Sequence, residues 1–146
     1  MEKQEIEIPM EVPVTTLGGS VLFPQAVMPL HIFEPRYREM LDEVLASDRI
    51  FAVAALDESS PENREKELPH AIAGIGVVRA CRTNQDGTSN LVLQGLARVR
   101  LEAITREQPF RKARIVQVQS EPGSPAEAIG AIRDSALDLV QAMIEL

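Results

Sequence analysis

A chain of 146 residues, 45% of them hydrophobic and 25% charged, has the composition of a globular protein and the length of one domain with a single core. Its net charge of −7 argues against general binding to a phosphate backbone, and its longest apolar run, residues 50–56, is too short to span a membrane. The acidic start lacks the pattern of a secretion signal, so we expect a cytoplasmic location. The single cysteine, Cys81, excludes an intramolecular disulfide and a cysteine-based zinc cluster, and we expect it to be a small buried residue.

The first elements of the chain are predicted to be extended. Residues 12–17 are rich in β-branched side chains and favour a short edge strand. A pair of glycines ends this strand, and the strongly apolar segment 21–33 follows. Two prolines inside that segment exclude a regular helix or a central strand, so we expect it to be extended and winding.

A helix is predicted to begin at Pro35, because proline at the first helical position sacrifices no hydrogen bond. Apolar residues then recur at helical spacing up to about Asp48, which indicates one buried face. These residues are Tyr37, Met40, Leu41, Val44 and Leu45. Residues 50–56 are apolar on both faces and fit a buried strand, whereas the polar, proline-punctuated residues 57–69 predict a mobile loop.

Glycines and one turn signal organise the rest of the β structure. Strands are predicted over residues 71–83, 90–104 and 112–119. Gly74 and Gly76 are typical of a strand bent at a barrel corner, Asp86-Gly87 predicts a hairpin, and Gly95 predicts a bulge. Five or six strands should therefore surround one helix.

A final helix is predicted from Ser124, where a capping serine, a proline and a glutamate follow in the expected order. Its apolar stripe continues to Leu146 without a stop signal, so we expect further helices in a longer protein, with a natural end at Leu146 as the alternative. We accordingly divide the chain into a barrel domain, 1–123, and the start of a helical region, 124–146.

The residues that carry chemistry are few. His31 and His70 lie far apart in the sequence without metal-ligand spacing, and no phosphate-binding loop occurs. The three lysines fall in a tail, a polar loop and a strand end, which disfavours a serine–lysine pair. Glu62, Glu65 and Glu67 belong to the polar loop, where we expect water to solvate them. We therefore predict no catalytic residue, no metal and no cofactor.

The apolar segment and its continuation to Tyr37 are the most distinctive part of the sequence. Its prolines hold the backbone extended, which suits a groove lining, although the segment could also simply plug the barrel. Ile32, Phe33 and Tyr37 are expected to tie the helix to the barrel as core residues. Glu34 and Arg36 could form an internal ion pair or cap, or Arg36 could face a peptide carboxylate.

At these residues the sequence resembles the N-terminal domain of ATP-dependent Lon proteases, which also occurs as stand-alone proteins. The resemblance rests on residues 21–24 and 28–37, with weaker support from residues 74–76, 95–99 and 109–113. It implies a mainly β, α+β fold: a PUA-like six-stranded pseudo-barrel with one packed helix, followed by the start of a C-terminal helical region. The chain lacks the ATPase and Ser-Lys peptidase modules of that family, so hydrolysis is not implied.

The resemblance further implies a non-catalytic module that recognises polypeptide substrates. The expected partners are unfolded or exposed apolar polypeptide segments. The candidate binding residues are Leu22, Phe23, Pro24, Val27, Met28, Pro29, His31, Phe33, Glu34, Arg36 and Tyr37.

Two alternative functions stay open at this point. PUA-like barrels elsewhere bind RNA, and residues 71–120 hold eight basic and three acidic residues, a local charge of +5. Five aromatic residues in total and the overall negative charge disfavour nucleic acid. The other alternative is a structural module that forms homo-oligomers through the C-terminal helix.

Overall fold

The computed structural model describes residues 7–18 and 21–118. The predicted helix from Ser124 and the domain boundary at residue 123 lie outside these residues and stay predictions. The elements are β1 (Glu11–Leu17), β2 (Val27–Ile32), α1 (Pro35–Leu45), β3 (Ile50–Leu56), α2 (Pro61–Glu65), β4 (Pro69–Thr83), β5 (Ser89–Arg106) and β6 (Arg111–Val118). Neither described helix has the length and apolar character needed to cross a membrane.

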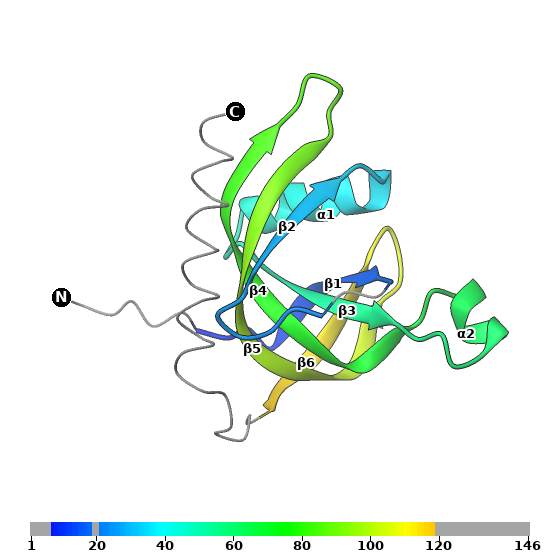
Figure 1. The fold of residues 1–146 in the computed structure, drawn as a ribbon. Coiled ribbons are helices and arrows are strands. Elements are labelled where there is room, and N and C mark those ends of the chain that lie inside the picture. The colour runs from blue at the N-terminus through cyan, green and yellow to red at the C-terminus, as the bar shows by residue number, and fades with distance from the viewer. Residues whose placement is uncertain (1–6, 19–20, 119–146) are drawn as a thin grey trace.

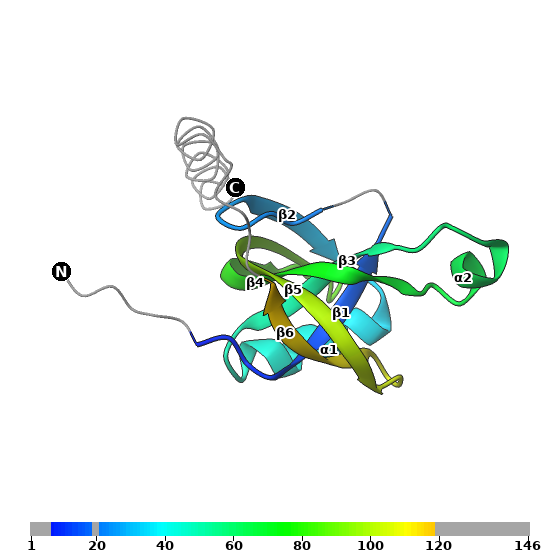
Figure 2. The same ribbon diagram turned by 90° about the horizontal axis from the view of Figure 1, so that it is seen from below.

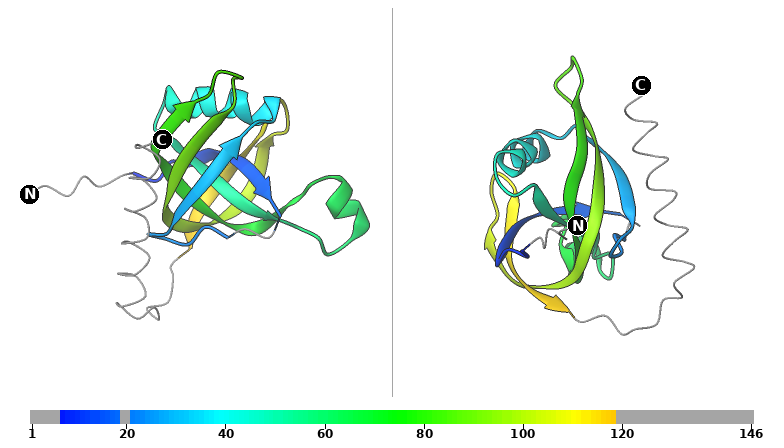
Figure 3. Two further views of the ribbon diagram at one scale, coloured as in Figure 1. Left: turned by 45° about the horizontal axis from the view of Figure 1, so that its top comes forward. Right: turned by 90° about the vertical axis from the view of Figure 1, so that its left-hand side faces the viewer.

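The six strands form one mixed sheet that nearly closes into a ring, which confirms the predicted mainly β class (Figure 1). Its order is β2-β5-β4-β3-β1-β6, and an additional pairing of β5 with β6 joins the two sides. Only β1 and β3 pair in parallel. The long strands β4 and β5 extend past the ring as a hairpin, and α1 lies at that same end (Figure 3). α2 stands away from the ring (Figure 2) on the connection between β3 and β4, residues 57–68, which we call the α2 excursion.

Two apolar clusters occupy the two faces of this sheet. Along β3 the side chains alternate: Ile50, Ala52 and Ala54 join one cluster, whereas Phe51 and Val53 join the other. The first cluster consists of alanine, valine and isoleucine side chains from β1, β3, β4, β5 and β6, and it fills the interior of the ring that these five strands close, with β2 attached outside at β5. The second combines larger residues from β3, β4, β5, α1 and the segment before β2. The apolar character of β3 on both faces follows from this double burial.

The predicted helix forms as α1, but it ends at Leu45, before Asp48. Pro35 occupies its first turn, and Tyr37, Met40, Leu41 and Val44 are buried as the spacing predicted. Leu45 is half-buried and packs against the second cluster. α1 therefore covers the large-residue face of the sheet.

Residues 57–69, predicted as a mobile loop, contain a helix that the prediction missed. A short second helix, α2, forms there, and the Ser60 hydroxyl accepts a hydrogen bond from the Asn63 amide at 3.1 Å. Pro61 follows Ser60 at the first helical position. The same serine–proline start signal was recognised at Ser124 and overlooked here, because charged residues dominate the surroundings. The prediction of a single helix is corrected accordingly.

Candidate functional site

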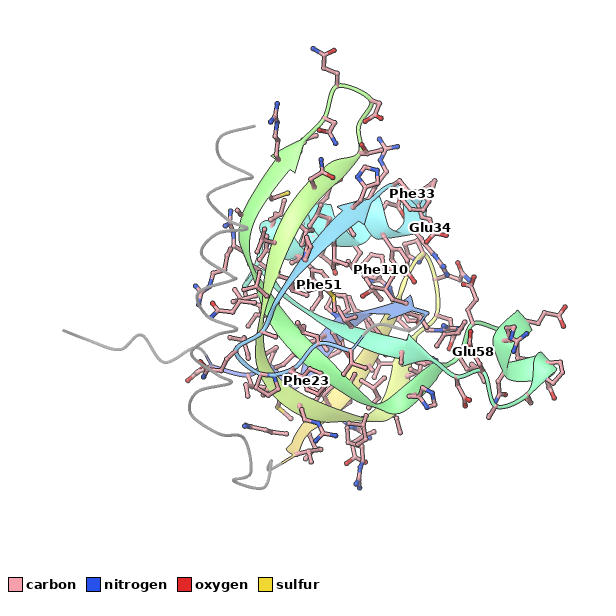
Figure 4. The ribbon with its side chains drawn as sticks, in the orientation of Figure 1. Phe23, Phe33, Glu34, Phe51, Glu58 and Phe110 are labelled. Atoms are coloured by element: carbon pink, nitrogen blue, oxygen red, sulfur yellow. The ribbon has the colours of Figure 1, made fainter. Side chains whose placement is uncertain are left out.

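β2 divides the distinctive apolar segment into two ends that lie apart on the barrel. Phe23 comes before β2, whereas Phe33 and Glu34 come after it, beside α1, and Figure 4 shows them well separated. We call residues 21–23 the seated end and residues 31–37 the ion-paired end. The structure therefore does not gather all the predicted binding residues into one site.

The seated end crosses the sheet over glycines that leave room for its backbone. A Cβ on Gly74 would collide with the Leu22 carbonyl oxygen, and a Cβ on Gly95 would collide with the Phe23 carbonyl oxygen. Gly76 faces the Leu22 side chain, with 3.0 Å between the position of such a Cβ and Leu22 Cδ2. We call these three glycines the glycine seat: Gly74 and Gly95 allow the close approach of two backbones, and Gly76 leaves room for the Leu22 side chain. The bend predicted at Gly74 and Gly76 is thus a contact surface.

Hydrogen bonds hold the chain on the seat just before β2. The Gln25 amide donates to the Gly95 carbonyl at 2.9 Å, and the Gly95 amide donates to the Ala26 carbonyl at 2.8 Å. The pairing of β4 with β5 shifts register beside Gly95, between Gly76 and Ile75, as the predicted bulge requires. The seated end is consequently fixed in position by the sheet beneath it.

The three side chains of the seated end point in different directions. Leu22 is only 2% exposed and belongs to the second apolar cluster. Val21 and Phe23 on either side of it are 61% and 57% exposed. An exposed phenylalanine held on a rigid backbone presents apolar surface to solvent at low entropic cost.

A cavity of about 410 Å³ opens beside the seated end, and we call it the apolar pocket. Its walls come from residues 21–23, from β3 and from the first half of β4. The lining residues are Val21, Leu22, Phe23, Val53, Ala55, His70, Ala71, Ile72, Ala73, Gly74 and Arg98. Among them only His70 and Arg98 carry polar side chains. A pocket of this size and lining suits one or two apolar side chains of a ligand.

The predicted residues between the two ends form an edge strand and its approach. Val27, Met28 and Pro29 belong to β2, which pairs with β5 on one side, and Pro29 is tolerated there because the strand lies at the edge of the sheet. Met28 packs against the second cluster, and Pro24 is half-buried. None of these four residues lines the apolar pocket.

The ion-paired end begins with two stacked rings. His31 and Phe33 have ring centroids 5.8 Å apart, and His31 Nδ1 lies 2.7 Å from the Asn90 side-chain oxygen. Phe33 is 60% exposed, so its predicted role as a core residue was wrong, whereas Ile32 and Tyr37 are buried as expected. A second hollow of about 100 Å³ lies beside Phe33 and includes Glu34 in its lining.

Charged contacts then tie this end to the α2 excursion. Arg36 forms its shorter ion pair with Glu67, at 2.8 Å, and a longer one with Glu34, at 3.5 Å. The predicted pair with Glu34 therefore exists, but the stronger partner lies on the excursion that was expected to be solvated. Arg111 also holds this excursion, since its guanidinium donates to the backbone carbonyls of Lys66 and Glu67. Tyr37 Oη accepts a hydrogen bond from the Thr16 amide at 3.2 Å.

Electrostatic shifts are confined to a few groups. Partial burial opposes the charge of Arg36, but its hydrogen bond to Glu67 and the nearby charges outweigh that effect and raise the pKa of Arg36. Hydrogen bonds from Ser59 lower the pKa of Asp57. Burial raises the pKa of the Cys81 thiol, which is half-buried against the second cluster and therefore a poor nucleophile.

The described part of the chain shows no group of three or more metal-ligating side chains. Arg98 and His70 are the only titratable residues in the apolar pocket, and no nucleophilic side chain lines it. What the pocket can do chemically is to bury apolar groups and to pair with one negative charge.

Sequence reasoning missed the wall of the pocket opposite the seated end. Val53 and Ala55 of β3, Ala71 and Ile72 of β4, and Arg98 of β5 were not singled out. A signal did exist for Val53, because a strand that is apolar on both faces needs cover on its outer face. Nothing in the spacing of the other residues indicated a shared cavity.

Comparison with known proteins gives a consistent family. Residues 11–146 match the family model described as the ATP-dependent protease La (LON) substrate-binding domain. A Lon protease from Flavobacterium johnsoniae is 26% identical over 145 residues, which cover 99% of this chain and 18% of that protein. Lon protease 2 from Thermus thermophilus is 30% identical, over 94% of this chain and 17% of that protein. The chain thus spans less than a fifth of the length of these relatives.

Solved structures support the fold. A crystal structure of a Lon N-terminal domain protein from Xanthomonas campestris superposes with a TM-score of 0.62 at 21% identity, covering 78% of this chain and 63% of that one. The N-terminal domain of a Lon protease from the Mycobacterium avium complex gives a TM-score of 0.59 at 15% identity, covering 93% and 75%. At such low identity these likenesses concern the architecture alone.

Proposed function

Since the chain belongs to the family of Lon protease substrate-binding domains, we propose that it is a non-catalytic module that binds exposed apolar segments of polypeptides in the apolar pocket. The observation that carries this proposal is the 410 Å³ cavity beside an exposed phenylalanine that the glycine seat holds in place. The expected partners are unfolded polypeptides in the cytoplasm. ATP hydrolysis and peptide-bond cleavage are not part of the proposal.

The expected affinity is low. Full burial of one leucine or phenylalanine side chain contributes about 1.5–3 kcal/mol, and ordering a flexible ligand offsets part of that gain. A pocket for one or two side chains therefore supports dissociation constants on the order of micromolar or weaker. Weak binding suits a domain that must sample many different unfolded chains and release them again.

Phe23 and Phe33 provide a matched pair for the test. Both are phenylalanines close to 60% exposed in the same segment, but only Phe23 lines the apolar pocket. Binding of a fluorescently labelled, unfolded polypeptide by anisotropy should weaken about fivefold or more in Phe23→Ala, the loss expected when one apolar contact of about 1 kcal/mol or more is removed. Phe33→Ala should bind as the unchanged protein does. Equal binding by both variants, or a larger loss in Phe33→Ala, would overturn the assignment to this pocket.

The alternatives have less support from the described residues. Of the five aromatic residues, Tyr37, Phe51 and Phe110 are buried, and the two exposed ones lie at opposite ends of β2, so no aromatic platform accompanies the arginines of β5. Oligomer formation through the C-terminal helix concerns residues outside those that the structure describes, and it stays a prediction.

A further inference from the structure

The apolar pocket differs from the other described pockets in its charge. Carboxylates line each of the other three: Glu34 in the hollow beside Phe33, Glu67 and Glu107 in a polar pocket, and Asp86 at the hairpin. The apolar pocket contains no acidic residue and includes Arg98. In a protein of net charge −7, this is a local reversal of the overall sign.

Arg98 lies opposite one residue of the glycine seat. On β5 it pairs in register with Gly74, which carries Leu22, while Arg100 pairs with Ile72 of the pocket wall. Both arginines point to the same face of the strand, roughly 7 Å apart along it. Both are exposed, and within residues 7–18 and 21–118 neither makes a hydrogen bond or ion pair. Arg98 therefore brings a guanidinium without a partner among these residues to the lining of an apolar cavity, and Arg100 follows on the same face of β5.

One carboxylate outside the pocket, that of Asp57, interacts electrostatically with His70 of the lining. This carboxylate accepts hydrogen bonds from the Ser59 amide at 3.0 Å and from the Asn63 side chain at 3.1 Å, so it is directed into its own turn. Since Asp57 is also outside the pocket lining, Arg98 meets no carboxylate within that lining.

From this geometry we infer that the pocket selects polypeptide segments in which an acidic residue neighbours the buried apolar residue, with Arg98 as the specificity-determining contact. The inference rests on the proposed function of the pocket and narrows its substrate class. A carboxylate next to the inserted side chain would meet the guanidinium in a charge-assisted, bidentate geometry. A lysine at that place would be repelled by both arginines.

Three synthetic peptides with the same central Leu-Phe-Leu core test the inference. Their flanks carry aspartates, lysines, or only glycine and serine, and binding to the full chain is measured by anisotropy at low and high salt. The aspartate peptide should bind about twofold to fivefold more tightly than the neutral one, the range of a partly exposed ion pair, and the lysine peptide more weakly. High salt should erase the difference, because it screens exposed charges.

Arg98→Gln should remove the preference for the aspartate peptide while retaining binding of the neutral one, and Arg98→Glu should invert the preference. Arg114→Gln is the matched control, because Arg114 is exposed on β6 and lies outside the pocket lining. It changes the net charge equally and should keep the preference.

The outcomes separate the two proposals. If the neutral peptide binds but flank charge has no effect, or if Arg114→Gln abolishes the preference as fully as Arg98→Gln does, the charge selection is refuted and the binding function stands. If none of the peptides binds at high concentration, both are refuted. A preference lost only with Arg98 supports the inference.

Discussion

The two ends of the segment around β2 are both rich in apolar residues, yet different forces hold them. The seated end lies on the glycine seat, with Leu22 sealed in the core and no ionisable group of its own. The ion-paired end is joined to Glu67 through Arg36, and the Glu67 carbonyl in turn accepts a hydrogen bond from Arg111. The first arrangement leaves a cavity and an exposed phenylalanine, whereas the second joins an excursion to the barrel.

This contrast explains why two apolar-rich stretches of one segment can differ in whether they leave room for a ligand. Removing side chains beneath a backbone lets it approach closely and leaves its own side chains free to face solvent. Charged contacts fix position equally well, but they fill the space with polar groups that must stay solvated or paired. A binding surface for apolar chains is therefore expected at the seated end.

The largest predicted effect is a loss of stability when the buried side chain of the seated end, Leu22, is truncated. Leu22→Ala should lower the free energy of unfolding by roughly 2–5 kcal/mol, because it leaves a cavity in the second apolar cluster. Chemical denaturation measures this change. Val21→Ala, at a side chain 61% exposed, serves as the control and should change stability by about 0.5 kcal/mol or less. Similar losses in both variants would show that the seated end is not anchored through Leu22.

Adding a side chain within the glycine seat should lower the free energy of unfolding by a smaller amount. Gly95→Ala places a methyl group against the Phe23 carbonyl, and the strain should lower the free energy of unfolding by about 1–3 kcal/mol. The substitution should also weaken polypeptide binding, because the segment must shift. Gly18→Ala is the matched control, since nothing lies within 4 Å of its added Cβ. If Gly95→Ala proves as harmless as Gly18→Ala, the seat has no structural role.

The ion-paired end should respond to a different substitution. Arg111→Met removes the donors to the carbonyls of Lys66 and Glu67 and should cost about 1–2 kcal/mol. Hydrogen exchange at the Asp57 amide, which donates to the Leu68 carbonyl at 2.7 Å, should become faster. Arg64→Met, an exposed arginine on α2, should leave this exchange unchanged. Polypeptide binding should survive both changes, and its loss in Arg111→Met would contradict the separation of the two ends.

The smallest predicted effect concerns pH. The pKa of Asp57 is held below its ordinary value of 3.8 by hydrogen bonds from Ser59, so its ionised form stabilises the turn at neutral pH. That contribution is present above the ordinary pKa and is lost as the pH falls through the lowered one. Carboxyl NMR titration should show the low pKa, with the neighbouring amides shifting along with it. Amides at the glycine seat should not follow this titration, and if they did, the turn at Asp57 would be coupled to the seated end.

Most of the fold could be predicted because its signals are local. Pro35 and the spacing from Tyr37 to Val44 defined α1, and the Asp86-Gly87 turn defined the β4–β5 hairpin. α2 was missed because its start signal at Ser60 is embedded in charged residues. The exposure of Phe33 was also unpredictable, since β2 carries the chain to the rim of the barrel before that residue.

For the candidate site, the sequence predicted the right stretch of chain but not which residues come together in space. Sequence reasoning selected residues 22–37 as one group, but a strand inside the group separates its ends in space. The role of Gly74 and Gly95 depends on a backbone fifty or more residues earlier in the chain, and the place of Arg98 depends on the register between β4 and β5. Such long-range contacts leave no periodic trace in a single sequence.

Methyl NMR tests the central claim most directly. The protein is titrated with a polypeptide whose cysteines have been reduced and alkylated so that it stays unfolded. The account predicts progressive shifts for Val21, Val53 and Ile72 of the apolar pocket, and unchanged signals for Leu17 and Leu30 beside Phe33. Shifts confined to the methyl groups near Phe33, or none anywhere at saturating concentration, would contradict it.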